Sequence, residues 1–141
     1  MQQAIALSNP NLISATTESD PILRFSDSKS ARASVFGPEP AHDWCYHFAK
    51  AELARQRSDW DEISRLDARA AQLGLSPADP LEWIPFIEAG ASRGEFDLSA
   101  ARTRQAVAER PFLRKAFCAA WNRAGQRQPL PAGLLEELGC Q

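Results

Sequence analysis

Two apolar periodicities joined by a short polar turn fill the stretch from Ala41 to Gly74. In the first, over about residues 41–57, apolar residues recur at offsets near four, seven and ten, as in a helix with one buried face. The second runs from Ile63 to Leu73 with similar spacing and stops at Gly74, a residue suited to the left-handed end of a helix. The two stripes comprise Trp44, Phe48, Ala51 and Ala54, then Ile63, Leu66, Ala70 and Leu73. Helices joined so closely pack antiparallel, so the stretch predicts a helical hairpin.

Polar residues mark where these two helices begin. Pro40 stands at a position where a missing backbone donor does no harm, and Asp43 is expected in the first turn, where the helix dipole favours negative charge. Either Ser58 or Asp59 can accept a hydrogen bond from the free amides that open the second helix.

A second hairpin, over about residues 81–108, follows as a copy about 36 residues downstream. The segment 93–97 corresponds to 57–61, with an acidic residue and an aromatic residue in the turn of each copy. Small residues at Ala54 and Gly90 allow two backbones to approach closely. The inner faces are expected to carry Trp83, Phe86, Ile87 and Gly90 on the third helix, 81–92, and Leu98, Ala101, Val107 and Ala108 on the fourth, about 97–108.

The two ends of the chain are predicted to differ. Residues 1–39 contain only short apolar pieces among Ser, Asn, Asp and Pro, so we interpret them as a flexible, largely irregular leader or linker before a helical domain at 40–141. Capping helices are expected at about 111–124 and 133–138. Their inner faces would be Phe112, Leu113, Phe117, Cys118 and Trp121, and then Leu134, Leu135 and Leu138.

The repeat of helix, acidic-aromatic turn and helix over roughly residues 40–125 resembles the tetratricopeptide-repeat family. Gly94, Glu95 and Phe96 match the family's turn, whereas His47 and Lys50 stand where the family prefers large apolar side chains. The resemblance implies an all-α fold of antiparallel hairpins stacked as a short solenoid, a non-catalytic protein-protein interaction module, and a protein or peptide partner. The groove positions that it implies are Glu52, Arg55, Ile84, Glu88 and Ser92, with Phe48 and Gln56, and with Lys115, Asn122 and Arg123 if the fifth helix keeps register.

A narrower resemblance concerns the segments 39–46 and 50–56, EPAHDWCY and KAELARQ. They are similar to the soluble C-terminal region of uncharacterised bacterial polytopic membrane proteins, some of them glycosyltransferase-like. The resemblance implies that the natural chain is longer and that this one is its soluble end. It supplies the alternative function, a regulatory or membrane-positioning domain of a longer bacterial membrane protein.

Composition limits the class of partner and the compartment. The 141 residues carry 18 acidic and 16 basic side chains, a net charge of -2, so no field of one sign recruits nucleic acid. No apolar run approaches the roughly 20 residues that cross a bilayer. The three cysteines, Cys45, Cys118 and Cys140, are an odd number without a close pair, which argues against a disulfide framework and for a reducing, cytoplasmic compartment.

No constellation of residues has the spacing that catalysis requires. His42 and Cys45 share a helix face at an offset of three, but His47 points away from it, and a zinc site needs about four ligands. The same geometry disfavours a Cys45–His47 dyad. The glycines are isolated, so no phosphate-binding loop is present. We therefore expect neither an enzyme nor a cofactor.

Charge is unevenly distributed along the second half of the chain. Between Leu98 and Arg127 seven basic residues face one acid, Glu109. The basic residues are Arg102, Arg104, Arg110, Arg114, Lys115, Arg123 and Arg127. The neutral Asn122 lies next to Arg123 and is included in the same candidate patch. One interpretation of this set is a solvated surface. The other is a patch that binds an anionic partner, either an acidic peptide or a membrane surface. Near a membrane each basic residue contributes about 1 kcal/mol to binding. Because the hairpins are few, an exposed end of the stack could also pair with a second copy.

Overall fold

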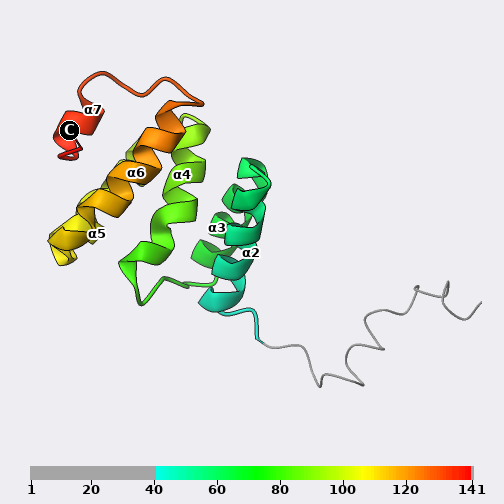
Figure 1. Cartoon of the computed structure of the whole chain (residues 1–141). Helices are drawn as coiled ribbons and strands as arrows, with labels where there is room; N and C mark the ends of the chain where they lie inside the picture. The colour runs from blue at the N-terminus through cyan, green and yellow to red at the C-terminus, as the bar shows by residue number, and fades with distance from the viewer. Residues whose placement is uncertain (1–40, 141) are drawn as a thin grey trace, which may run out of the picture. The chain divides into compact units, whose positions relative to one another are not determined.

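The computed structural model describes residues 41–140, in which every regular element is helical and no strand occurs (Figure 1). The all-α class predicted from the sequence is confirmed for this part of the chain, whereas the leader predicted for residues 1–39 lies outside it. The helices are α2 (Trp44–Gln56), α3 (Trp60–Gln72), α4 (Ile84–Ser92), α5 (Phe96–Glu109), α6 (Arg114–Gly125) and α7 (Leu134–Glu137). Short 3-10 turns, η3 (Pro80–Trp83) and η4 (Pro111–Leu113), lead into α4 and α6.

The helices α2 and α3 pack together after a three-residue connection, and polar caps mark both starts. Asp43 caps α2 by accepting a hydrogen bond from the Tyr46 amide at 3.1 Å, so it precedes the first turn and does not lie in it. Asp59 caps α3 by accepting from the Glu62 amide at 3.0 Å. The predicted inner face of α3 ends one turn early, because Leu73 is 46% exposed.

The helix α4 is the centre of the fold and contacts α2, α3, α5 and α6 (Figure 1). Every residue from Pro85 to Ala91 is buried, as expected of a helix surrounded by other helices. Pro85 lies at the start of α4, where the missing backbone donor is tolerated. Side chains on any face of α4 are therefore placed against a neighbouring helix.

The buried face of α5 differs from the predicted one. Leu98 is 57% exposed and Ala101 and Ala108 are also exposed, whereas Ser99 and Thr103 are buried. Ser99 meets Gly90 of α4, where no side chain larger than hydrogen fits without displacement. Buried polar groups are tolerated when they are hydrogen-bonded, and a small residue permits a closer approach than leucine does. The apolar pattern therefore predicted Val107 correctly, because it is buried, but it was wrong for Leu98, Ala101 and Ala108.

Two clusters of buried residues form the core. One joins α2, α3 and α4 through Trp44, Ile63 and Phe86, and the other joins α4 to the C-terminal helices. Members of the second cluster include Ile87, Val107, Leu113, Phe117, Trp121, Leu134 and Leu138. Trp83 packs against both clusters, so the core is continuous through η3.

The segment before α6 corrects a further prediction. Phe112, expected inside, is 77% exposed, whereas Leu113 is buried as expected. Pro111 begins a 3-10 turn, whose tighter winding changes which residues face the core before α6 begins.

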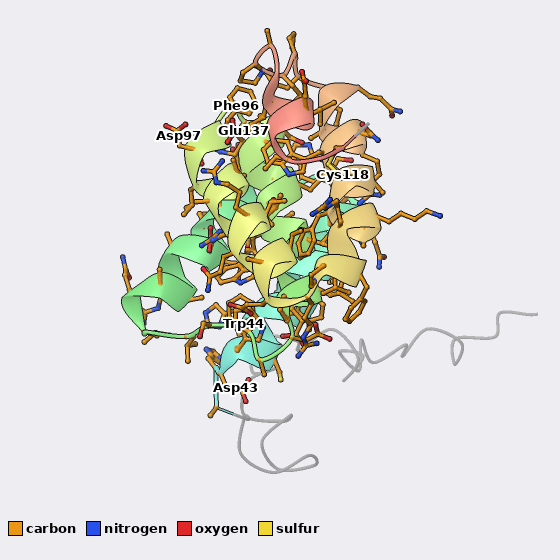
Figure 2. All side chains as sticks on the ribbon, turned by 90° about the vertical axis from the view of Figure 1, so that its left-hand side faces the viewer. Asp43, Trp44, Phe96, Asp97, Cys118 and Glu137 are labelled. Atoms are coloured by element: carbon orange, nitrogen blue, oxygen red, sulfur yellow. A yellow bond between two sulfur atoms is a disulfide. The ribbon has the colours of Figure 1, made fainter. Side chains whose placement is uncertain are left out.

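The cysteines also depart from the sequence-based expectation. Cys118 on α6 and Cys140 form a disulfide, with their Cα atoms 5.2 Å apart, and only Cys45 is free among the described cysteines (Figure 2). Their distance along the chain concealed this pairing, because the chain turns back after α6 and brings α7 against the second cluster. Leu134 and Leu138 are buried there, as predicted for the final helix.

Candidate functional site

A buried carboxylate at the middle of α4 is contacted by charged side chains from two other helices and from a turn. The side chain of Glu88 is 3% exposed, and arginines reach it from α2 and from α6 and the turn that follows α6. We call the assembly the Glu88 cluster, which consists of Glu52, Arg55, Glu88, Ser92, Arg123 and Arg127. It lies along the contacts of α4 with α2 and α6.

Three guanidinium groups donate hydrogen bonds to the Glu88 carboxylate. Arg123 donates through Nη2 to Oε2 at 2.9 Å and through Nε to both oxygens at 3.2 Å. Arg127 donates through Nη2 to Oε1 at 2.5 Å, and Arg55 through Nη1 to Oε2 at 3.4 Å. The two strongest contacts therefore come from the C-terminal part of the fold, and the third connects Glu88 to α2.

Further contacts hold the arginines in place. Arg55 Nη2 donates to Glu52 Oε2 at 2.9 Å, and Arg127 Nε donates to Ser92 Oγ at 3.2 Å. The Arg127 guanidinium also lies 4.4 Å from the centroid of the Trp60 ring, at the start of α3. Such cation–π stacking and multiple hydrogen bonds restrict the side-chain rotamers, so the cluster is a preorganised surface.

Opposing effects act on the pKa of Glu88. Burial disfavours the ionised carboxylate and would raise its pKa, but the hydrogen bonds and positive charges of Arg123 and Arg127 lower it, and the net result lies below the ordinary value. Glu88 is therefore ionised at neutral pH. Three arginines then face two glutamates, which leaves the cluster with one excess positive charge.

The cluster is suited to binding an anion. The side chains of Arg55, Arg123 and Arg127 are 30%, 42% and 33% exposed. Each therefore reaches solvent while it also contacts the buried Glu88 carboxylate. The Nη1 groups of Arg123 and Arg127 take part in none of the hydrogen bonds that build the cluster. Free guanidinium donors on fixed side chains match carboxylate or phosphate oxygens.

No family model, curated protein or solved structure matches this chain.

Most of the residues that the family resemblance assigned to a groove lie together in the structure. Glu52, Arg55, Glu88 and Ser92 all belong to the Glu88 cluster, whereas Ile84 packs against the second hydrophobic cluster. From the predicted basic patch, Arg123 and Arg127 join the same cluster, and Asn122 is an exposed neighbour on α6.

Most other members of the basic patch have acidic partners elsewhere. Ion pairs join Arg102 to Asp67, Arg104 to Glu137 and Arg110 to Asp79. Arg114 and Lys115 are exposed at the start of α6 and form no ion pair within residues 41–140. The basic stretch is thus divided into an arginine cluster on Glu88, separate interhelical pairs, and two unpaired cations.

The residues considered for metal binding do not come together. His42 is exposed and stacks on Tyr46, Cys45 is exposed, and His47 is buried with Nδ1 2.9 Å from the Asp43 carbonyl oxygen. Within residues 41–140 no group of three or more His, Cys, Asp or Glu side chains is arranged to hold a metal ion.

Sequence reasoning identified members of the cluster but not their pairing. A usable signal existed, because Glu88–Arg123, Ser92–Arg127 and Asp67–Arg102 all join residues 35 positions apart. That spacing is close to the sequence period of about 36 residues noted above. The Trp60–Arg127 contact and the Cys118–Cys140 disulfide do not have this separation along the sequence, so the period could not have revealed them.

Across the described part of the chain, every helix is too short or too polar to traverse a bilayer.

Proposed function

We propose that this chain is a non-catalytic interaction module of tetratricopeptide-like hairpins, whose Glu88 cluster binds an acidic peptide. The arrangement of contacts supports this proposal, because α4, which carries Glu88, contacts both α2, which carries Arg55, and α6, which carries Arg123. In a stack of hairpins, such first helices line the surface that receives a peptide.

The observation that carries the proposal is the shared anchoring of three arginines on one buried carboxylate. An arginine that is already fixed loses little side-chain entropy when it binds. Arg123 and Arg127 each retain an unused Nη1 group and partial exposure, so a carboxylate can bind without displacing Glu88. Acidic side chains or a peptide C-terminus supply that carboxylate.

The test is an array of labelled synthetic peptides rich in Asp and Glu, measured by fluorescence anisotropy at low salt. We expect the wild-type protein to bind a subset, and the Arg123→Gln/Arg127→Gln variant to bind the same peptides at least about tenfold more weakly. The matched control is Arg65→Gln/Arg69→Gln, which removes two positive charges from α3, outside the cluster.

The two variants distinguish site binding from general charge attraction. Equal losses in both would mean that acidic peptides are attracted nonspecifically, and binding of no peptide by the wild type would refute the proposal. Circular dichroism melting checks that each variant is folded at the assay temperature.

One observation favours the alternative, a membrane-positioning domain of a longer bacterial membrane protein. Phe112 is 77% exposed and lies two to three residues before the unpaired cations Arg114 and Lys115. An exposed aromatic ring beside cations suits an anionic bilayer surface. Sedimentation with phosphatidylglycerol-containing vesicles, compared with Phe112→Ser, tests it, and absence of binding at low salt would exclude it.

A further inference from the structure

The last part of the chain is fastened to the fold by a covalent bond at its far end. After α6 the amides of Arg127 and Gln128 donate to the Ala124 carbonyl, and residues 129–140 then cross to the second hydrophobic cluster. We call residues 129–140 the C-terminal cap. Cys140 at its end is joined to Cys118 on α6, while α7, its only helix, has four residues (Figures 1 and 2).

Few noncovalent contacts hold the C-terminal cap. Leu134 and Leu138 are its buried anchors, and the Arg104–Glu137 ion pair joins side chains that are 50% and 59% exposed. The amides of Glu137, Leu138 and Cys140 bond to carbonyl groups of the cap itself, at 2.7–3.0 Å. An exposed ion pair contributes little, so the anchoring depends on the disulfide, on Leu134 and Leu138, and on the partly buried Leu130 and Leu135 that pack against the same cluster.

A pocket open to solvent borders the C-terminal cap. It has a volume of about 350 Å³ and lies between α5, η4 and α7, and Val107, Pro111 and Leu138 are among the residues that line it. Solvent therefore reaches this side of α7, which no other element within residues 41–140 covers.

We propose that the Cys118–Cys140 disulfide is a redox-controlled latch of the C-terminal cap. Cys118 and Cys140 are both partly exposed, so a dithiol reductant can reach them. One reductant thiolate attacks the bond and forms a mixed disulfide, and the second displaces the remaining protein thiolate. The Cys118–Cys140 bond breaks, a reductant disulfide forms, and the two reductant protons end on the protein thiols.

Release of the latch uncovers apolar surface without dismantling the Glu88 cluster. Leu113 and Phe117 belong to the cluster that Leu134 and Leu138 cover, so they gain solvent exposure when the cap opens. The hydrophobic cluster of α2, α3 and α4 includes no cap residue. Reduction thus changes one end of the domain, and this inference is independent of the proposed peptide binding.

Amide hydrogen exchange by NMR on the full chain tests the latch, with and without dithiothreitol. A disulfide that closes a loop of this length suppresses opening by roughly a hundredfold, so we expect exchange at Leu138 and Cys140 to accelerate by about that factor on reduction. Amides in the interior of α4 should change far less. Cys140→Ser should behave like the reduced protein and should not respond to dithiothreitol.

Cys45→Ser is the matched control, because it removes the free, exposed cysteine and leaves the latch intact. It should respond to dithiothreitol as the wild type does. Equal protection of the cap amides in oxidised and reduced wild type would overturn the proposal. It would also be overturned if α4 lost protection in parallel with the cap, because the disulfide would then stabilise the whole domain.

Discussion

Arg102 of α5 donates two parallel hydrogen bonds to Asp67 of α3, from Nη1 at 2.7 Å and from Nη2 at 2.8 Å. The same guanidinium lies over the Trp83 ring, 4.0 Å from its centroid. The two charged side chains are only 14% and 19% exposed. This enclosed pair with two hydrogen bonds joins α3 to α5 and helps to fix their relative orientation.

Arg102→Lys is therefore expected to lower the free energy of unfolding by about 1–2 kcal/mol, because an ammonium group cannot form the paired bonds or stack equally well. Urea denaturation followed by tryptophan fluorescence measures the change. Arg104→Lys is the matched control, since its pair with Glu137 is 50% and 59% exposed and should matter by less than about 0.5 kcal/mol. Equal effects of the two substitutions would contradict a special role for the enclosed pair.

The lowered pKa of Glu88 predicts a pH-dependent contribution to stability. A carboxyl whose pKa is lower in the folded state stabilises the fold above its unfolded-state pKa and loses that contribution as the pH falls through the folded-state value. We expect Glu88→Gln to be less stable than wild type at neutral pH. The difference should diminish below about pH 4.5, the reference from which the Glu88 pKa is lowered.

Denaturation midpoints of wild type and Glu88→Gln between pH 7 and pH 3 measure this dependence. Glu62→Gln is the comparison, because it breaks an exposed pair with Arg65 on α3 and should have a small effect throughout. A stability difference for Glu88→Gln that stayed constant across the range would contradict the assignment.

Local sequence signals predicted the elements of the fold better than their faces. The cap at Asp59, one of the two residues predicted for it, and the glycine at Gly74 depend on nearby backbone, so they are readable from short windows. The start of α2 was also predicted, although Asp43 caps that helix and does not lie in its first turn. The inner face of α5 depends instead on which neighbour approaches it. Leu98 is outside and Thr103 inside because α4 and α6 provide a close contact and a hydrogen-bond partner, which apolar periodicity does not encode.

In the candidate site, too, individual residues were predictable from the sequence but their contacts were not. Family resemblance named Arg55, Glu88 and Arg123 separately, but the burial of Glu88 among arginines depends on three helices meeting. The disulfide was missed for a related reason, since Cys118 and Cys140 are 22 residues apart and only the reversal of the chain after α6 brings them together. Pairings of this kind require tertiary structure.

Thr103 is the buried acceptor for the indole of Trp121, at 3.0 Å, and its hydroxyl donates to the Ser99 carbonyl at 2.9 Å. Thr103→Val keeps the shape but leaves the fully buried Trp121 N–H without its acceptor. It should lower the free energy of unfolding by about 1–3 kcal/mol. Thr103→Ser, which retains the hydroxyl, should cost less in chemical denaturation, and a valine variant as stable as the serine variant would contradict the importance of this bond.

Gly90 of α4 lies against Ser99 of α5. A Cβ atom at position 90 would overlap the Ser99 Oγ, while it would lie 3.8 Å from the Ser99 Cβ, an ordinary contact. Gly90→Ala should therefore lower the free energy of unfolding by about 1–3 kcal/mol, despite the better helix propensity of alanine. In a Ser99→Ala background the overlap is removed.

A double-mutant cycle isolates that overlap from the other effects of each substitution. The loss of the Ser99 Oγ hydrogen bond to the Glu95 carbonyl occurs in both Ser99→Ala proteins, so it cancels in the comparison. We expect Gly90→Ala to cost at least about 1 kcal/mol less in that background than in wild type. Additive costs would mean that the Glu95 carbonyl, 3.3 Å from the added Cβ, limits the approach of the helices instead of Ser99.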